Sequence, residues 1–102
     1  MSRVTLFVYG SLRRGERHHA ELCGAPFLGA VITEPAYRVV RQGGYPALVA
    51  GSAGVHGELY AVDAPLLASL DAFEGPGYRR APVLLEDGTH ADAYFGAGGA
   101  PE

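Results

Sequence analysis

The chain contains few of the residues that cross-link a protein or anchor it in a membrane. Its 102 residues include one cysteine, Cys23, so an internal disulfide is excluded. No apolar run approaches the roughly 18 residues that a membrane-spanning helix needs. The sequence also does not open on a charged segment followed by an apolar stretch, as a secretion signal would. We therefore expect no membrane association and a cytoplasmic location.

Positive charge is also scarce. The net charge is −3, and the basic residues include only short pairs such as Arg13-Arg14 and Arg79-Arg80. Nucleic-acid surfaces need clustered Lys and Arg to neutralise phosphates. We therefore expect no nucleic-acid partner.

What the sequence does contain is typical of a small folded domain. Hydrophobic residues make up 48% of it, and its 15 glycines and 7 prolines separate many short apolar runs. This punctuation is typical of many strands and few helices. We expect a single α+β domain over 1–102 with six or seven strands, one or two helices and a loose tail at 97–102. That many short strands around one core favours a closed or nearly closed barrel. The expected strands are 3–9, 25–34, 37–42, 45–50, 55–62, 78–86 and 89–96, with a short helix or turn at 16–23.

A longer helix is predicted between Asp63 and Gly75. Asp63 is a suitable N-cap, Pro65 falls in the first turn, and leucines at helical spacing supply an apolar stripe. Glu74 then falls in the last turn, where the helix dipole disfavours a carboxylate and raises its pKa. A raised pKa suits a general base at neutral pH. Two interpretations stay open: a catalytic carboxylate, or a solvated surface glutamate.

The stretch Tyr-Gly-Ser-Leu at 9–12 follows the first expected strand. Gly10 permits unusual dihedrals and close approach of a ligand to the main chain. Consecutive N–H groups in such a turn can converge on an anion or a polarised carbonyl. From the turn alone, an ordinary corner is the better interpretation, and an anion-binding turn is the alternative.

Other candidate residues carry weaker signals. Ser11 is a conceivable nucleophile, but no histidine has a recognisable place as its base. His19 and Cys23 have the i, i+4 spacing of two zinc ligands without a third, so we expect no metal site and a buried, apolar role for Cys23. Glu58 is better explained as a paired or outward-facing carboxylate. Four tyrosines lie at strand ends or beside glycines, where a hydroxyl can face a pocket: Tyr9, Tyr45, Tyr78 and Tyr94.

Several separated motifs together resemble the γ-glutamylcyclotransferase-like superfamily, which includes the AIG2-like group and its small bacterial members. The match runs in order from residue 4 to about residue 95. The motifs are VYGSLRRG (8–15), FLG (27–29), YPALV (45–49), VHGELYAV (55–62) and LDAFEGPGYRR (70–80). The resemblance implies a small mixed β-barrel with flanking helices and a cavity at one end.

The resemblance also implies roles for individual residues. The family's catalytic glutamate falls on Glu74, and its γ-glutamyl-binding loop falls on Tyr9, Gly10, Ser11 and Leu12. Tyr78 and Tyr94 would line the pocket. The implied reaction is attack of the substrate's α-amine on its own γ-carbonyl, which forms 5-oxoproline and releases an amine without a metal or cofactor. The chain is short for the family and ends soon after Tyr94, which leaves the leaving amine and the oligomeric state undefined. A barrel that binds a small acidic or γ-glutamyl metabolite without turnover is the alternative.

Overall fold

The computed structural model describes residues 3–96. It contains seven strands, an α-helix and a one-turn 3₁₀ helix. The predicted loose tail at 97–102 lies outside the described residues. The strands are β1 (Arg3–Val8), β2 (Phe27–Ile32), β3 (Tyr37–Gln42), β4 (Tyr45–Ala50), β5 (His56–Asp63), β6 (Tyr78–Leu84) and β7 (His90–Gly96), and the helices are η1 (His19–Leu22) and α1 (Ala64–Glu74).

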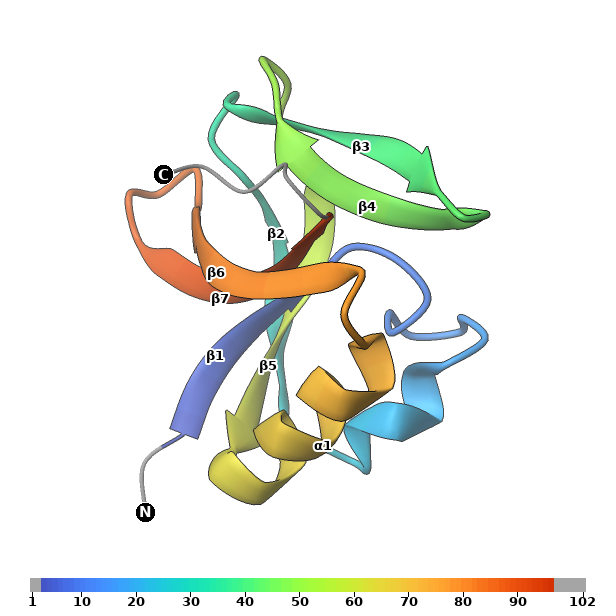
Figure 1. Cartoon of the computed structure of the whole chain (residues 1–102). Coiled ribbons are helices and arrows are strands. Elements are labelled where there is room, and N and C mark those ends of the chain that lie inside the picture. The colour runs from blue at the N-terminus through green and yellow to red at the C-terminus, as the bar shows by residue number, and fades with distance from the viewer. Residues whose placement is uncertain (1–2, 97–102) are drawn as a thin grey trace.

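All seven strands belong to one mixed sheet that curls on itself. Along the sheet the order is β2-β5-β1-β7-β4-β3, and β6 pairs with the other edge of β7. A bridge between Thr33 and Leu85 joins the chain just after β2 to the chain just after β6. The sheet is thus barrel-like. A fully closed barrel would have a continuous ladder of hydrogen bonds between these two segments, and here one isolated bridge joins them. The β3–β4 hairpin lies at one end, and α1 and η1 cover the other (Figure 1).

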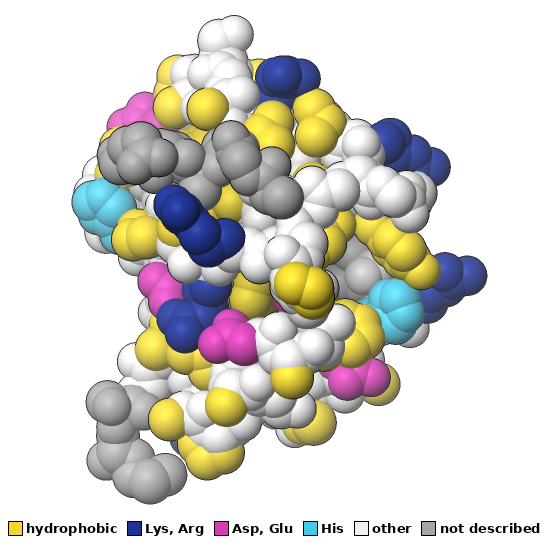
Figure 2. Space-filling view, in the orientation of Figure 1, with side chains coloured by type: hydrophobic (Ala, Val, Ile, Leu, Met, Phe, Trp, Pro, Cys, Tyr) yellow, Lys and Arg dark blue, Asp and Glu magenta, His cyan; other side chains and the backbone are white. Residues whose placement is uncertain are grey.

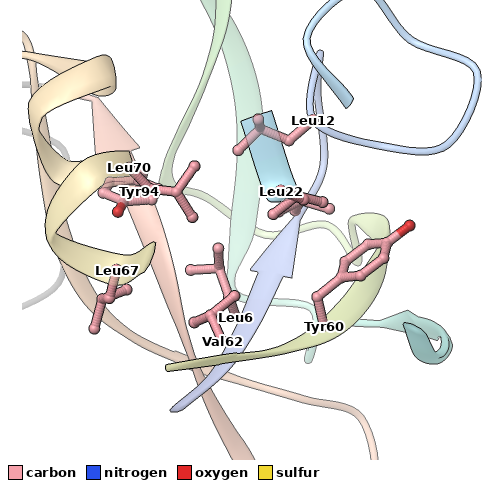
Figure 3. Close-up of a cluster of buried hydrophobic side chains, with 9 residues drawn as sticks. Leu6, Leu12, Leu22, Tyr60, Val62, Leu67, Leu70 and Tyr94 are labelled. Atoms are coloured by element: carbon pink, nitrogen blue, oxygen red, sulfur yellow. The ribbon is translucent and has the colours of Figure 1, made fainter. Parts of the chain in front are cut away.

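Strand β1 is a central strand that lies between β5 and β7. Its last three residues, Leu6 to Val8, are buried on both faces of the sheet. Leu6 and Val8 belong to a buried cluster that includes Leu70 of α1. Figure 3 shows Leu6 and Leu70 in this cluster on the helix side of the sheet. Phe7 points the other way, into a second cluster with Phe95 of β7. This two-sided burial explains why the sequence of β1 is apolar without alternation.

The predicted long helix is confirmed. The Asp63 carboxylate accepts a hydrogen bond from the Leu66 N–H at 3.0 Å, and Gly75 ends the helix with a positive φ of 76°. Leu67 and Leu70 of the predicted apolar stripe are buried, whereas Phe73 is 40% exposed.

The predicted buried role of Cys23 is wrong. Its side chain is exposed, at the end of η1, and its backbone has a positive φ of 50°. The turn that reverses the chain after η1 places the residue outside the core, although Leu22 beside it is buried.

Candidate active site

One pocket of about 290 Å³ brings together all seven residues that the sequence singled out as a site. It lies where the end of β1, the start of β4 and the end of α1 meet. Hydrophobic and histidine side chains border a hollow between the β3–β4 hairpin and the helices (Figure 2). The lining residues are Phe7, Val8, Tyr9, Gly10, Ser11, Leu12, His18, Tyr45, Pro46, Phe73, Glu74, Tyr78 and Tyr94.

The turn after β1 forms one wall of this pocket. The Gly10 carbonyl accepts a hydrogen bond from the Arg13 N–H at 3.1 Å, which closes the turn. Within residues 3–96, the N–H groups of Gly10, Ser11 and Leu12 donate to no other group. Unused amides beside a cavity are suited to bind an anion or a polarised carbonyl.

The reason for a glycine at position 10 differs from the one expected. Gly10 does not have a positive φ, so unusual dihedrals do not explain it. A Cβ atom there would lie 2.8 Å from Cγ of Pro46. The glycine therefore allows β4 to approach the turn closely, which narrows the pocket at this point.

Glu74, the last residue of α1, lies on the same pocket. Burial raises the pKa of its carboxyl group. Among the described residues, its carboxylate has no hydrogen-bond or ion-pair partner. An unpaired, half-buried carboxylate beside a cavity is poised to accept a proton from a bound molecule.

Of the four tyrosines that line the pocket, Tyr9, Tyr78 and Tyr94 have hydroxyl groups that form hydrogen bonds within the protein. The Tyr9 hydroxyl donates to the Tyr94 carbonyl at 2.6 Å and accepts from the Leu48 N–H at 2.9 Å, so it links β7 to β4. The Tyr78 hydroxyl donates to the Pro46 carbonyl at 3.0 Å. Burial raises the pKa of each of these phenols. Leu12 also belongs to the helix-side core, so its contribution to the pocket is mainly shape.

Asp71 and Arg80, which the sequence did not single out, fix the end of α1. Asp71 lies one turn before Glu74 and accepts hydrogen bonds from Nε of Arg80 at 2.9 Å and from the Tyr94 hydroxyl at 2.6 Å. Arg80 also donates to Asp92 at 2.8 Å. The hydrogen bonds from Arg80 lower the pKa of Asp71. The helix that carries Glu74 is thereby attached to the β6–β7 hairpin.

Ser11 has a histidine partner that could not be recognised in the sequence. Nδ1 of His18 lies 3.0 Å from Oγ of Ser11, and the His18 N–H donates to the Ser11 carbonyl at 2.9 Å. His18 also packs edge-on against Phe73, with ring centroids 5.2 Å apart. The two residues are seven positions apart in an irregular loop, where no periodicity predicts a contact.

The arginines beside the turn do not line the pocket. The Arg13 guanidinium donates to the Gly10 carbonyl, and the Arg14 guanidinium lies 3.9 Å above the centre of the Phe27 ring. Glu58 is a paired carboxylate, as predicted: it accepts hydrogen bonds from the Arg14 N–H and the Tyr60 hydroxyl. Residues 3–96 hold no group of three or more His, Cys, Asp or Glu that could bind a metal ion.

A small barrel-like mixed sheet with an unpaired carboxylate and a turn of unused amides on one pocket defines a class of small α+β protein with a candidate ligand site. Residues 6–98 match the family described as gamma-glutamyl cyclotransferase, AIG2-like, so the chain belongs to that family. No helix in the described part of the chain is long and apolar enough to cross a membrane.

Relatives and solved structures agree with this assignment. A Vibrio cholerae protein provisionally named a gamma-glutamylcyclotransferase is 44% identical over 86 residues, which cover 82% of this chain and 75% of that protein. The gamma-glutamylaminecyclotransferase C of Danio rerio is 38% identical over 98 residues, covering 84% of this chain and 64% of that protein. A crystal structure of a Pyrococcus horikoshii protein superposes with a TM-score of 0.80 at 33% identity, over 97% of this chain and 81% of that chain.

Proposed function

We propose that the chain, as a single domain, is a γ-glutamyl cyclotransferase in which Glu74 is the general acid and base. The observation that carries the proposal is the unpaired Glu74 carboxylate, with its raised pKa, on one pocket with the unused amides of 10–12. A pocket of about 290 Å³ suits a γ-glutamyl group folded back on itself. The family assignment supports the same class of enzyme.

The reaction needs proton transfers and correct positioning. Glu74 removes a proton from the substrate's α-ammonium group, and the free amine attacks the γ-carbonyl carbon. A C–N bond forms within a five-membered ring, and Glu74 returns the proton to the leaving nitrogen as the bond to that nitrogen breaks. The ring nitrogen gives up a second proton, which ends on the released amine as an ammonium group. The products are 5-oxoproline and a free amine, and no water is consumed. Holding the reacting groups of one molecule together can supply about 7 kcal/mol or more. The turn amides would receive the charged end of the substrate or the developing oxyanion.

The test is a panel of γ-glutamyl compounds with mass-spectrometric detection of 5-oxoproline. The panel should include γ-glutamyl amino acids, ε-(γ-glutamyl)lysine and a γ-glutamyl polyamine, because the name of the Danio rerio relative points to amines. On an accepted substrate we expect Glu74→Gln to lower kcat about 10²- to 10⁴-fold. Glu86→Gln, an exposed glutamate outside the pocket, is the matched control and should retain activity. Full turnover by Glu74→Gln would show that the base is misassigned.

The same panel separates two other functions. Hydrolysis through Ser11, for which the contact with His18 supplies a base, would release free glutamate and leave a covalent intermediate that Ser11→Ala abolishes. A binding protein without turnover would be stabilised by the panel compounds and form no product, and Glu74→Gln would still bind them.

A further inference from the structure

The pocket can offer a bound molecule very few charges. Among its lining residues, Glu74 is the carboxylate, and His18 is the one side chain that can carry a positive charge. A γ-glutamyl group carries an α-ammonium and an α-carboxylate. The proposed function assigns the ammonium to Glu74, which leaves the α-carboxylate to the turn amides and to the part of the wall that holds His18.

His18 is fixed against the wall by three contacts. The backbone N–H of His18 donates to the Ser11 carbonyl. Nδ1 of the imidazole lies 3.0 Å from Oγ of Ser11, and the ring packs on Phe73 of α1. The contacts of the ring with Ser11 and Phe73 therefore fix the orientation of the imidazole beside the turn. Its protonation state determines what the Ser11 hydroxyl can do.

The Ser11 hydroxyl has one proton to donate. When Nδ1 of His18 is unprotonated, it accepts that proton, and the side of Oγ that faces the pocket offers only lone pairs. When Nδ1 carries a proton, it donates to Oγ, and the hydroxyl proton is free for a ligand oxygen. A carboxylate in the pocket is therefore repelled in the first state and bound in the second.

We propose, on the basis of the proposed function, that His18 is the residue that recognises the substrate's α-carboxylate, and that it acts through the Ser11 hydroxyl. In this proposal the neutral ring holds its remaining proton on Nε2, so that Nδ1 becomes an acceptor when the imidazolium loses a proton. The affinity for a carboxylate ligand should then fall as the pH rises through the range in which imidazoles lose their proton, between about pH 5 and 8. His18 is a positioning residue in this scheme, because the hydrogen bond to the ligand comes from Ser11.

Few other groups near His18 change charge in that range. Glu74 comes from α1, and burial raises the pKa of its carboxyl group. Phenols ionise near pH 10, and burial raises the pKa of Tyr9, Tyr78 and Tyr94 further.

The charged neighbours along the loop do not line the pocket. Arg17 is exposed, and the Glu16 carboxylate pairs with Arg13 at 4.0 Å. The other histidine of the loop, His19, bonds through Nδ1 to the Leu12 carbonyl and packs near Tyr60. The experiment therefore has to separate the contributions of His18 and Glu74.

The reaction product is the sharpest probe. 5-Oxoproline has the carboxylate, lacks the titratable α-amine and is not turned over, and 5-oxoprolinamide is the same lactam without the charge. We would measure both affinities by calorimetry between pH 5 and 8. For the unaltered protein at pH 5.5 we expect the acid to bind about tenfold or more tightly than the amide, since hydrogen bonds to charged groups contribute this much. The preference should decline toward pH 8.

Five variants identify the source of this preference. Glu74→Gln should keep the pH-dependent decline, whereas His18→Ala should lose both the decline and most of the preference. His18→Asn should keep the preference at every pH, because an amide N–H donates to Ser11 Oγ without titrating. Ser11→Ala should match His18→Ala, and the double variant should be no worse than either. His90→Ala, an exposed histidine outside the pocket, is the control.

Thermal unfolding would establish that each variant is folded before its affinity is interpreted. Equal affinity for acid and amide, no binding of either, or a pH-dependent preference that survives in His18→Ala would overturn the proposal. The test needs no turnover. A protein that passes it and forms no 5-oxoproline would refute the cyclotransferase assignment and leave the role of His18 standing.

Discussion

At the level of single residues, Glu74 links the chemistry of the site to the stability of the fold. Burial raises the pKa of its carboxyl group above the ordinary value of 4.5, so the folded chain holds this proton more tightly than the unfolded chain. Between the ordinary and the raised value the folded state binds more protons, and the free energy of unfolding falls as the pH rises. At neutral pH the ionised Glu74 therefore costs stability.

This cost predicts that Glu74→Gln is more stable than the unaltered protein at pH 7, although the same change should lower the proposed activity. Relief of the unfavourable helix-end charge alone should contribute about 0.3–1 kcal/mol. The measurement is urea-induced unfolding at pH 7 and at pH 4, where the gain should shrink because Glu74 is then largely protonated. Glu86→Gln should show no comparable gain, since Glu86 is exposed. A variant that is less stable at pH 7 would contradict this account.

At the level of elements, the position of Glu74 depends on how α1 is held against the β6–β7 hairpin. Asp71 receives two hydrogen bonds from Arg80, at 2.9 and 3.2 Å, and one from the Tyr94 hydroxyl. Asp71→Asn changes one side-chain atom of the helix. It removes the negative charge through which Arg80 holds the last turn of α1 against the β6–β7 hairpin. Small displacements of a catalytic group are costly, so with Glu74 as the proposed acid and base we expect kcat to fall about tenfold while KM changes less than threefold.

The control for Asp71→Asn is Asp92→Asn. It removes the other carboxylate bound by Arg80 and leaves the contacts of Asp71 in place. Its kcat should stay within about twofold of the unaltered protein. An equal loss in both variants would mean that the ion pairs act through general stability and do not position Glu74.

The elements themselves could be predicted, and this network could not. Asp63, Pro65 and Gly75 mark the ends of α1 through local backbone chemistry, and Glu74 was noticeable because it breaks the helix-dipole rule. Asp71 and Arg80 are nine residues apart and meet only because α1 packs beside the hairpin. His18 and Ser11 meet through an irregular loop. Such contacts depend on tertiary packing, which no local pattern encodes.

At the level of the whole molecule, strand number could be predicted but strand order could not. The alternation of apolar and polar residues defines the two faces of a strand, and flanking Gly and Pro residues define its ends. Neither pattern defines which strands pair with it. Strand β7 pairs in parallel with β1 at Leu6 and with β4 at Leu48. The hydroxyl of the pocket residue Tyr9 bonds to both β7 and β4, so the pocket depends on strand pairings that no local pattern specifies. The short closure of the sheet at Thr33 and Leu85 is equally non-local.

That closure is built around one buried polar side chain. Thr33 is 1% exposed, and its Oγ1 accepts a hydrogen bond from the Val55 N–H at 2.9 Å and donates to the Glu34 carbonyl at 2.8 Å. The Glu34 N–H donates to the Leu84 carbonyl at 3.0 Å, which ties the chain after β2 to the end of β6. The pocket residue Tyr78 lies at the other end of β6, about 20 Å away at the usual rise of a strand.

A substitution at Thr33 should therefore lower the free energy of unfolding without changing kcat. Thr33→Val keeps the shape of the side chain but leaves the partly buried Val55 N–H without its Thr33 acceptor, which should cost about 1–3 kcal/mol of unfolding free energy. Thr5→Val makes the same chemical change in β1, where the hydroxyl forms no hydrogen bond within residues 3–96, and it should cost much less. Urea-induced unfolding measures the difference, and kcat measured well below the unfolding temperature should be unchanged in both. Suppose instead that Thr33→Val lost activity while its free energy of unfolding stayed unchanged. The contact between the chain after β2 and the end of β6 would then be coupled to the pocket, and the two ends of β6 would not act independently.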